Sequence, residues 1–313
     1  MSRRVLITGA SGFAGGHLAR ACADAGDDVV DLSRSSGLGV DLLDAAAVRE
    51  AVRKAAPDVV HHLAARAHVG ESWREPEAYL RENAAMAFHL LDAVREEAPG
   101  VPVVVASSSE VYGPPARLPV DESAPLRPQN PYAVSKASAD LLAGFFADAH
   151  GLRVLRARPF NHAGPGQEPI YAIASFARQI AAGLVAGEDP VRVVTGNPDA
   201  RRDYTDVRDV VRAYRALADA AEPGVYNVCS GRTASAAELV AALGHAAGVE
   251  VDHVVDPSLR RANEVMEVRG SSARLHAATG WEPRIPLEQT LADTVAWWTE
   301  EIRAGRAPER LHE

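Results

Sequence analysis

Residues 8–15 read Thr8-Gly9-Ala10-Ser11-Gly12-Phe13-Ala14-Gly15 and follow directly on the aliphatic run Arg4–Thr8. Glycine at every third position, between a strand and a helix, is typical of the turn that binds the diphosphate of a dinucleotide. The first glycine allows the tight turn, the second lets the diphosphate approach the backbone, and the third lets the helix pack closely. The helix N-terminus then offers free amides to the anion. We therefore expect a dinucleotide to bind Gly9, Ser11, Gly12, Phe13, Ala14 and Gly15.

Short aliphatic runs alternate with longer amphipathic segments over the first half of the chain. The runs are Arg4–Thr8, Asp28–Leu32, Asp58–Leu63, Pro102–Ala106 and Arg153–Ala157. The segments between them are Phe13–Ala25, Ala45–Ala55, Pro76–Glu97 and Tyr132–His150. Strands that alternate with helices of this length form a parallel sheet covered by helices. The sequence thus predicts an α/β fold with a doubly wound, Rossmann-like parallel sheet.

The pattern becomes less regular beyond about residue 160, with loops rich in Gly and Pro at His162–Pro169 and Gly196–Asp199. We expect residues 1–160 to form a dinucleotide-binding domain and residues 161–313 to form mainly a smaller, C-terminal substrate-binding region. Asp206–Glu222 followed by Val225–Cys229 again has the pattern of a helix and then a strand. Residues from about 206 to 229 are therefore expected to return to the first domain.

Composition excludes several classes of protein. The chain has 313 residues, of which 47% are hydrophobic, so it can bury a sizeable core. A net charge of -9 argues against a nucleic-acid partner, because phosphate contacts need clustered cations. No run approaches the length of a membrane span, and the N-terminus has no apolar stretch of a signal peptide. With only Cys22 and Cys229, no disulfide framework is expected, and a cytoplasmic location fits.

The choice of cofactor depends on where the second strand ends. An acidic residue at that point would hold the adenosine ribose, and a basic residue would accept the 2′-phosphate of NADP. If Ser33 and Arg34 form the tip, NADP(H) is favoured; if Asp31 forms it, NAD(H) is favoured. Arg34 could also be a solvated loop residue. Asp41 and Leu42 are expected near the adenine.

Two stretches about twenty residues apart supply the groups for carbonyl or alcohol chemistry. Tyr132 and Lys136, spaced i and i+4, share one face of the expected helix. An ammonium near a phenol favours the phenolate, so Tyr132 could exchange a proton with an alcohol or a carbonyl. Ser108, at the carboxyl end of the fourth strand, could hydrogen-bond the same oxygen. The alternative is a surface Tyr and Lys without a chemical role.

At these residues the sequence resembles a known family. The glycine turn, His62-Leu63-Ala64-Ala65, Ser108-Ser109-Glu110-Val111-Tyr112-Gly113 and Asn130-Pro131-Tyr132-Ala133-Val134-Ser135-Lys136 are similar to those of extended short-chain dehydrogenase/reductases that epimerise, dehydrate or reduce nucleotide sugars. Residues 158–167 and 200–209 are most similar to the GDP-4-keto-6-deoxy-mannose reductases, with the GDP-mannose 4,6-dehydratases as close relatives. The resemblance covers nearly the whole chain.

The resemblance implies a modified Rossmann fold, NADP(H) as cofactor, a GDP-sugar as substrate and a homodimer built on a helix bundle. It implies Ser108, Tyr132 and Lys136 as the catalytic triad. It also places Leu63, Ala64, Ala65 and Pro159 beside the cofactor.

Glu110 keeps the activity open. A dehydratase needs a carboxylate base at C5 of the sugar, and Glu110 stands beside the triad. The dehydratases' usual Asn-His-Glu-Ser-Pro loop is here Asn161-His162-Ala163-Gly164-Pro165, which favours reduction of the C4 carbonyl over dehydration. Epimerisation is a further alternative, and a carboxylate that only accepts strand-end amides is another. A protein that binds NADP without chemistry would be expected to have a broken triad, and here the triad is intact.

Several residues are expected on the substrate side. Arg202, placed on a loop after Gly196-Asn197-Pro198, is expected to pair with the diphosphate, since a guanidinium holds phosphate bidentately. Matching the family's Arg-Pro-x-Glu-Val segment onto residues 261–265 assigns Arg261 to phosphate and Glu264 to the ribose, although Ala262 replaces the proline. The resemblance also brings Ser109 and Asn161 to the substrate.

A metal site is not expected. His61 and His62 are adjacent strand residues that point to opposite faces, and no further ligands have suitable spacing. His68, Trp73 and Asn83 could border the pocket or fill loops, and the sequence gives no preference.

Overall fold

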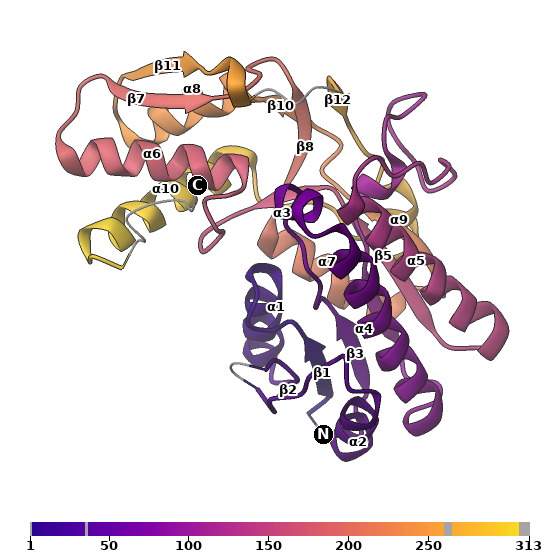
Figure 1. Ribbon diagram of the computed structural model, residues 1–313. Coiled ribbons are helices and arrows are strands. Elements are labelled where there is room, and N and C mark those ends of the chain that lie inside the picture. The colour runs from indigo at the N-terminus through magenta and orange to yellow at the C-terminus, as the bar shows by residue number, and fades with distance from the viewer. Residues whose placement is uncertain (1, 35–36, 260–264, 307–313) are drawn as a thin grey trace. The chain divides into compact units, whose positions relative to one another are not determined.

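The computed structural model describes residues 2–34, 37–259 and 265–306. The chain divides into two compact units. Unit 1 comprises Met1–Phe160, Val210–Val228 and Ser271–Glu282, and unit 2 comprises Asn161–Asp209, Cys229–Gly270 and Pro283–Glu313. Each unit is described by itself below (Figure 1).

Unit 1 is built on a six-stranded parallel sheet with the strand order β2-β1-β3-β4-β5-β9. The strands are β1 (Arg4–Thr8), β2 (Asp28–Asp31), β3 (Val59–His62), β4 (Val103–Ala106), β5 (Val154–Pro159) and β9 (Gly224–Val228). The order reverses at β1, where the chain moves first to β2 and then to β3 on the other side. Parallel sheets bind ligands beyond the carboxyl ends of their strands at such a switch point. The predicted doubly wound parallel sheet is confirmed.

Helices accompany this sheet. They are α1 (Phe13–Asp24), α2 (Ala45–Ala55), α3 (Val69–Arg74), α4 (Pro76–Glu97), α5 (Pro131–His150), α9 (Ala273–Thr279) and most of α7 (Val207–Ala220), with the 3₁₀ helix η1 (Ser109–Tyr112) after β4. On one face, α2, α4 and α5 bury a continuous apolar cluster with β-strand residues such as Leu6, Val60 and Val105. Figure 1 shows α4 and α5 side by side, and these two helices pack along their length. Among the described residues, no helix is both long enough and apolar enough to cross a lipid bilayer.

In the part of unit 2 that the structure describes, there are two small sheets and three α-helices. The strands β6 (Asn161–Ala163), β10 (Thr233–Ser235) and β12 (Glu267–Val268) each pair with β8 (Arg201–Asp206), while β7 (Val191–Thr195) pairs with β11 (Val251–Val255). The helices are α6 (Ala172–Ala186), α8 (Ala236–Ala247) and α10 (Leu287–Arg303), with the 3₁₀ helix η2 (Pro257–Leu259). Their apolar faces, including Trp298 of α10, form a second core.

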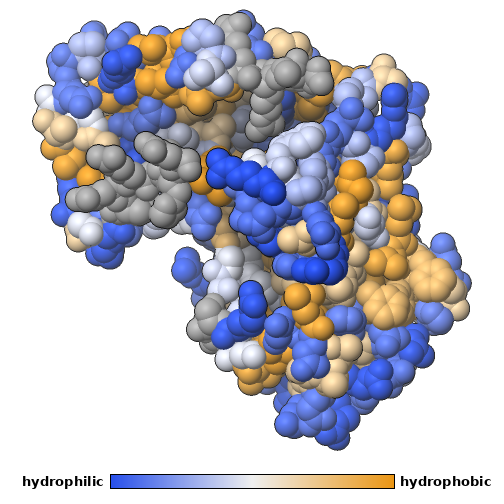
Figure 2. All heavy atoms as spheres, viewed as in Figure 1, coloured by the Kyte–Doolittle hydropathy of each residue, from blue (hydrophilic) through white to orange (hydrophobic). Residues whose placement is uncertain are grey.

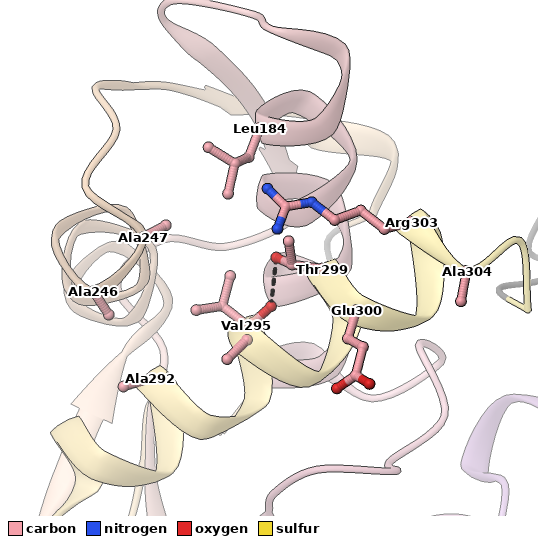
Figure 3. A pocket seen from close by; sticks show the side chains of 10 residues that line it. Leu184, Ala246, Ala247, Ala292, Val295, Thr299, Glu300, Arg303 and Ala304 are labelled. Atoms are coloured by element: carbon pink, nitrogen blue, oxygen red, sulfur yellow. Dashed lines mark hydrogen bonds between the residues drawn. The ribbon is translucent and has the colours of Figure 1, made fainter.

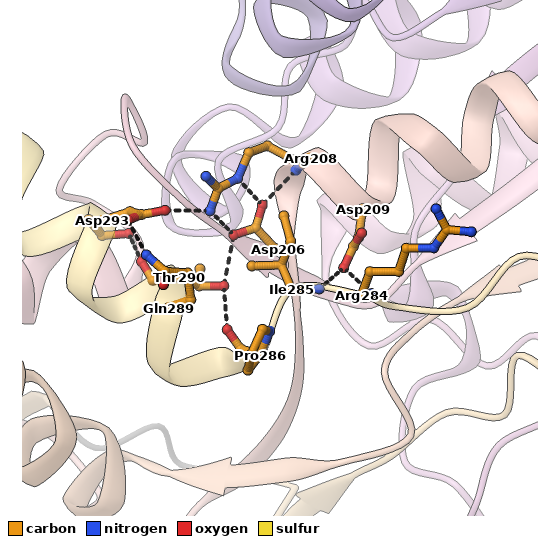
Figure 4. Close-up of polar contacts among 10 residues, drawn as sticks. Asp206, Arg208, Asp209, Arg284, Ile285, Pro286, Gln289, Thr290 and Asp293 are labelled. Atoms are coloured by element: carbon orange, nitrogen blue, oxygen red, sulfur yellow. Dashed lines mark hydrogen bonds and ion pairs between the residues drawn. The ribbon is translucent and has the colours of Figure 1, made fainter.

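A buried carboxylate joins β8 to α10 inside unit 2. The Asp206 side chain accepts hydrogen bonds from Arg208 Nε at 2.8 Å and from Thr290 Oγ1 at 2.8 Å (Figure 4). Arg208 also pairs with Asp293 at 2.7 Å. Nearby, Asp209 accepts the backbone amides of Arg284 and Ile285. The motif at residues 206–209 therefore has a structural role in unit 2.

Candidate active site

The three glycines of the turn after β1 meet different surroundings. Gly9 has φ +76, and a Cβ there would lie 2.7 Å from the backbone nitrogen of Ala64. A Cβ on Gly15 would collide with the carbonyl oxygen of Gly9. Gly12 has an ordinary φ of -81, and a Cβ there would lie 3.3 Å from Gly9 O. The fold itself thus requires Gly9 and Gly15, whereas a Cβ on Gly12 would meet only Gly9 O, in a tight contact.

The N-terminus of α1 is prepared for an anion. Gly12 is its N-cap and has no side chain to accept the first amides, and the first turn carries no acidic residue. Unsatisfied amides and the helix dipole together favour a bound phosphate. Phe13 and Ala14 supply the first backbone groups of this helix, and the exposed Ser11 precedes it. These residues fit the diphosphate of a dinucleotide.

The second strand ends at Asp31, one residue earlier than the sequence predicted. Asp31 Oδ1 accepts the backbone N–H of Ser33 at 2.6 Å, so this carboxylate is used within its own turn. Ser33 is buried, and its Oγ accepts the N–H of Ser11 at 3.2 Å, which ties this turn to the glycine turn. Arg34 follows with its side chain exposed. Asp31 therefore forms the tip, which is the arrangement expected to favour NAD(H), but its Oδ1 is used within the turn and the exposed Arg34 follows three residues later.

Asp41 and Leu42, expected near the adenine, have structural contacts. Asp41 Oδ1 accepts the N–H of Leu43 at 3.0 Å. The Leu42 side chain belongs to the apolar cluster of unit 1, and its carbonyl oxygen lies 2.9 Å from His89 Nδ1.

The loop after β3 is tied to the end of β1. Leu63 donates its N–H to Thr8 O at 3.1 Å, and Ala64 donates its N–H to Thr8 Oγ1 at 3.2 Å. The same hydroxyl lies 2.8 Å from His62 Nδ1. Burial and the nearby charge of Lys136 lower the pKa of His62 to about 3, so this ring stays neutral. Leu63, Ala64 and Ala65 therefore follow β3 at the switch point, where the glycine turn also lies.

Ser108 stands between β4 and η1. Its side chain is 8% exposed, and its Oγ accepts the backbone N–H of Glu110 at 3.2 Å. A hydroxyl that accepts one hydrogen bond still has a proton to donate. Ser108 can thus donate to a ligand oxygen, while Ser109 opens η1 with its side chain partly exposed.

Lys136 is buried on α5, one turn after the partly exposed Tyr132. Lys136 Nζ donates to the carbonyl oxygen of Ala106, the last residue of β4, at 2.5 Å. Burial lowers the pKa of Lys136 to about 8, and the carboxylate of Asp140 acts in the opposite direction. The contact with Ala106 joins α5 to the strand end that Ser108 follows. The structure thereby brings the elements that carry all three predicted catalytic residues together within unit 1.

Asn83 on α4 contacts α5 and the loop after β3. Its Nδ2 donates to Ser135 Oγ at 2.8 Å and to Arg66 O at 3.0 Å, and its Oδ1 accepts the N–H of Arg66 at 2.8 Å. Ser135 in turn donates its hydroxyl to Tyr132 O at 2.7 Å. The sequence left the place of Asn83 open, since its partners lie 17 and 52 residues away in the chain.

A second buried polar group, which the sequence did not predict, includes Asp140, one turn after Lys136 on α5. Arg158 holds the fully buried Asp140 through Nε and Nη2, each at 2.8 Å. Arg158 Nη1 donates to the Tyr112 hydroxyl at 3.1 Å, and that hydroxyl donates to Asn227 Oδ1 at 2.7 Å. The group joins α5 to η1, β5 and β9. Pro159, which is expected beside the cofactor, ends β5 directly after Arg158.

Of the substrate-side residues, Asn161 and Arg202 belong to unit 2. Arg202 lies within strand β8 and not on a loop, so that expectation was wrong. Arg201 is engaged with Thr233 and Glu238, and Arg202 Nη1 donates to the backbone oxygen of Arg201 at 2.9 Å. Asn161 opens β6 opposite Tyr204 of β8. Arg261 and Glu264 lie outside the described residues.

Among the described residues, unit 2 has at least two cavities. One, of about 590 Å³, is lined by residues from α6, α8, α10 and the C-cap of α10 (Figure 3). The other, of about 270 Å³, is lined by residues such as Tyr204, Arg232 and Leu291. Within the described ranges, neither is lined by a residue that the sequence analysis assigned to the site.

Comparisons with known proteins agree with this geometry. Residues 37–294 match the model of the GDP-mannose 4,6 dehydratase family. The chain is 40% identical over 306 residues to GDP-6-deoxy-D-mannose reductase of Pseudomonas aeruginosa, covering 97% of this chain and 99% of that protein. It is 33% identical to dTDP-glucose 4,6-dehydratase of Streptomyces griseus, covering 98% and 100%. The solved structure of RMD from Pseudomonas aeruginosa, complexed with NADPH, is similar with a TM-score of 0.87 and 39% identity, covering 96% and 99%.

Proposed function

The chain belongs to the GDP-mannose 4,6-dehydratase family within the extended short-chain dehydrogenase/reductases, and we propose that it reduces the C4 carbonyl of GDP-4-keto-6-deoxy-mannose with NADPH. The product is a GDP-6-deoxyhexose such as GDP-rhamnose. The observation that carries this proposal is the joining of the elements of Ser108, Tyr132 and Lys136 through the contact of Lys136 with Ala106.

Ser108 and Tyr132 act on the carbonyl oxygen. The Ser108 hydroxyl, held by the N–H of Glu110, donates a hydrogen bond that polarises the C=O bond. The Tyr132 phenol donates the proton that the oxygen takes up as the carbonyl becomes an alcohol. Solvent restores the phenol proton afterwards.

Lys136 supports Tyr132 from within the protein. Its ammonium donates to Ala106 O, which holds the charge at the end of β4. A neighbouring cation stabilises the phenolate that forms when Tyr132 gives up its proton.

The cofactor binds to unit 1. When bound, NADPH supplies the hydride that adds to C4. The glycine turn and the amides of α1 hold its diphosphate, with Leu63, Ala64, Ala65 and Pro159 beside it. Ser33 and Arg34 receive the 2′-phosphate, since the Asp31 carboxylate is turned to the N–H of Ser33.

The GDP-sugar is held by residues of unit 2. Arg202 pairs with its diphosphate, because a guanidinium matches phosphate geometry, and Asn161 supports the same group. Arg261 binds phosphate and Glu264 binds the ribose, as the family pattern implies.

A second candidate activity is the dehydration of GDP-mannose. Two observations favour it: residues 37–294 match the GDP-mannose 4,6 dehydratase family, and Glu110 places a carboxylate two residues after Ser108. In this reaction the cofactor would be unchanged overall, since it would be reduced and reoxidised within one turnover.

The test is to mix the purified protein with NADPH and GDP-4-keto-6-deoxy-mannose, and separately with GDP-mannose. Loss of NADPH absorbance in proportion to the keto sugar supports the reductase. Conversion of GDP-mannose to the keto sugar without net loss of NADPH identifies the dehydratase instead.

A homodimer through α4 and α5 is part of this proposal. Exposed apolar residues recur along these helices, with Leu80 at 39%, Phe88 at 43%, Leu141 at 60% and Phe145 at 52% exposure. Figure 2, viewed as in Figure 1, shows hydrophobic residues gathered over these helices. Exposed apolar patches of this kind mark interaction sites.

Light scattering tests the dimer. We expect the native chain to have twice the mass of the Phe145→Glu variant, because a charge in the interface is left unpaired. Val185→Glu on α6, where the replaced side chain is 40% exposed, is the matched control and should remain dimeric. A monomeric native chain would contradict the proposal.

A cytoplasmic location is also proposed. Among the described residues, Cys22 and Cys229 are both buried and neither forms a disulfide. Burial raises the pKa of Cys22 to about 11, which keeps this thiol unreactive. Free thiols are typical of proteins in a reducing compartment.

A further inference from the structure

Glu110 and Asn130 are joined by a direct contact. Asn130 Nδ2 donates to Glu110 Oε2 at 3.2 Å. Glu110 belongs to η1, which begins directly after Ser108, and Asn130 is the N-cap of α5. One hydrogen bond thus bridges the two elements that carry Ser108 and Tyr132.

The Asn130 side chain uses both of its ends. While Nδ2 reaches Glu110, Oδ1 accepts the backbone N–H of Ala133 at 2.7 Å and so caps α5. Tyr132 lies between the cap and Ala133, in the first turn of the helix. The turn that carries the phenol is therefore fixed at its start by Asn130, and Asn130 is fixed by Glu110.

The backbone of Glu110 orients Ser108, the second residue proposed to bind the carbonyl oxygen of the substrate. Its N–H donates to Ser108 Oγ at 3.2 Å, which sets the orientation of that hydroxyl. Glu110 therefore contacts the Ser108 hydroxyl through its backbone and the start of the Tyr132 helix through its side chain.

We propose that Glu110 is a positioning residue: it acts through Asn130 to hold Tyr132 in its position relative to Ser108. It transfers no proton. The inference rests on the proposed reduction of a C4 carbonyl. A small misplacement of a proton donor can lower a rate about 100-fold, so a contact of this kind affects turnover without touching substrate.

The chemistry of the contact separates positioning from proton transfer. Asn130 Nδ2 needs only an acceptor, and the amide oxygen of glutamine is also an acceptor. A general base needs a group that takes up a proton, which an amide does not do near neutral pH. Replacing the carboxylate by an amide therefore preserves the first role and abolishes the second.

The experiment compares Glu110→Gln with Glu110→Ala in the NADPH assay with the keto sugar. We expect Glu110→Gln to retain kcat within about threefold and Glu110→Ala to lose about 10- to 100-fold in kcat, with little change in KM. Glu50→Gln on α2 is the matched control for the loss of one carboxylate charge, since Glu50 pairs with Arg53 there and should not affect kcat. Equal loss in Glu110→Gln and Glu110→Ala would overturn the inference, as would full activity of Glu110→Ala.

Asn130→Ser tests the route of the effect. Serine caps helices as well as asparagine does, but its shorter side chain lacks the Nδ2 amide that reaches Glu110. We expect Asn130→Ser to lose as much kcat as Glu110→Ala, and the double variant to lose no more than either single variant, because both remove one contact. Additive losses would show that Glu110 acts by a route other than Asn130.

Hydrogen exchange keeps this inference distinct from the proposed activity. If the native chain consumes no NADPH with the keto sugar, the proposed reduction fails. The amides of residues 133 and 134 then still report on positioning: they should exchange faster in Glu110→Ala than in the native chain, and at the native rate in Glu110→Gln. Unchanged exchange in Glu110→Ala would overturn the inference whatever the activity.

Discussion

At the scale of single residues, we expect Lys136 to set the dependence of activity on pH. Burial holds its pKa at about 8, so its ammonium is present below that pH and is lost above it. We expect kcat/KM for the keto sugar to fall as the pH rises through about 8. Lys136→Met should lose this limb and roughly 100-fold or more in rate. The check is NADPH consumption between about pH 6.5 and 9.5, and a profile that stays level to the upper limit would contradict the assignment.

Gly12 and Gly9 form a matched pair at the same scale. We expect Gly12→Ala to unfold at nearly the native urea concentration but to bind NADPH at least about tenfold more weakly, because its methyl group enters the space for the diphosphate. Gly9→Ala should cost about 1–3 kcal/mol of unfolding free energy, given the φ of +76 and the close backbone of Ala64. Titration of NADPH fluorescence and urea denaturation measure the two effects. Tight binding by Gly12→Ala would show that the diphosphate lies elsewhere.

At the scale of elements, the pairing of Asp140 and Arg158 fixes α5 on β5. Asp140 is fully buried, and removing it leaves the Arg158 guanidinium buried without its carboxylate. We expect Asp140→Ala to lower the unfolding free energy by about 3–5 kcal/mol. Tyr112→Phe removes two hydrogen bonds of the same group, one from Arg158 and one to Asn227, and should cost about 1–2 kcal/mol. Urea denaturation of the two variants decides, and equal small losses would show that the pairing contributes little.

The sequence predicted the elements of unit 1 well because buried parallel strands are nearly continuous aliphatic runs. Val103–Ala106 is such a run, and so is β1, which precedes the glycine turn. Strand β8 was missed because Arg201–Asp206 begins with three charged residues and has no apolar face. The contacts of Glu110 with Asn130 and of Arg158 with Tyr112 join positions 20 and 46 residues apart, and periodicity within one element carries no information about them.

At the scale of the whole molecule, two buried histidines make stability depend on pH. Burial lowers the pKa of both His61 and His62 to about 3 in the folded chain, against 6.5 when exposed. The folded form keeps them neutral, and the unfolded form binds protons below about pH 6.5. The unfolding free energy should therefore fall as the pH is lowered from 6.5 toward 3, by at most about 1.4 kcal/mol per unit for each ring.

His61→Leu isolates one of these contributions. Both ring nitrogens of His61 are buried without a hydrogen-bond partner among the described residues, so leucine leaves no donor or acceptor unpaired. Measured by urea denaturation, the variant should gain stability relative to the native chain as the pH falls from 7 to 5. An unchanged difference between the two proteins at the two pH values would contradict the assignment.

The order in which the strands occur in the chain has a consequence for synthesis on the ribosome. The β5 strand ends at Pro159, but its neighbour β9 begins only at Gly224. At a translation rate of roughly 5–20 residues per second, several seconds pass between the synthesis of β5 and that of β9. During this time one edge of the nascent sheet is unpaired. Unpaired edges are places where strands of other chains can add, so a chaperone that shields the emerging chain would act in this interval. Asn227, which accepts the hydrogen bond of the Tyr112 hydroxyl, belongs to β9. The buried polar group of Asp140, Arg158 and Tyr112 is therefore also completed only when β9 has been synthesised.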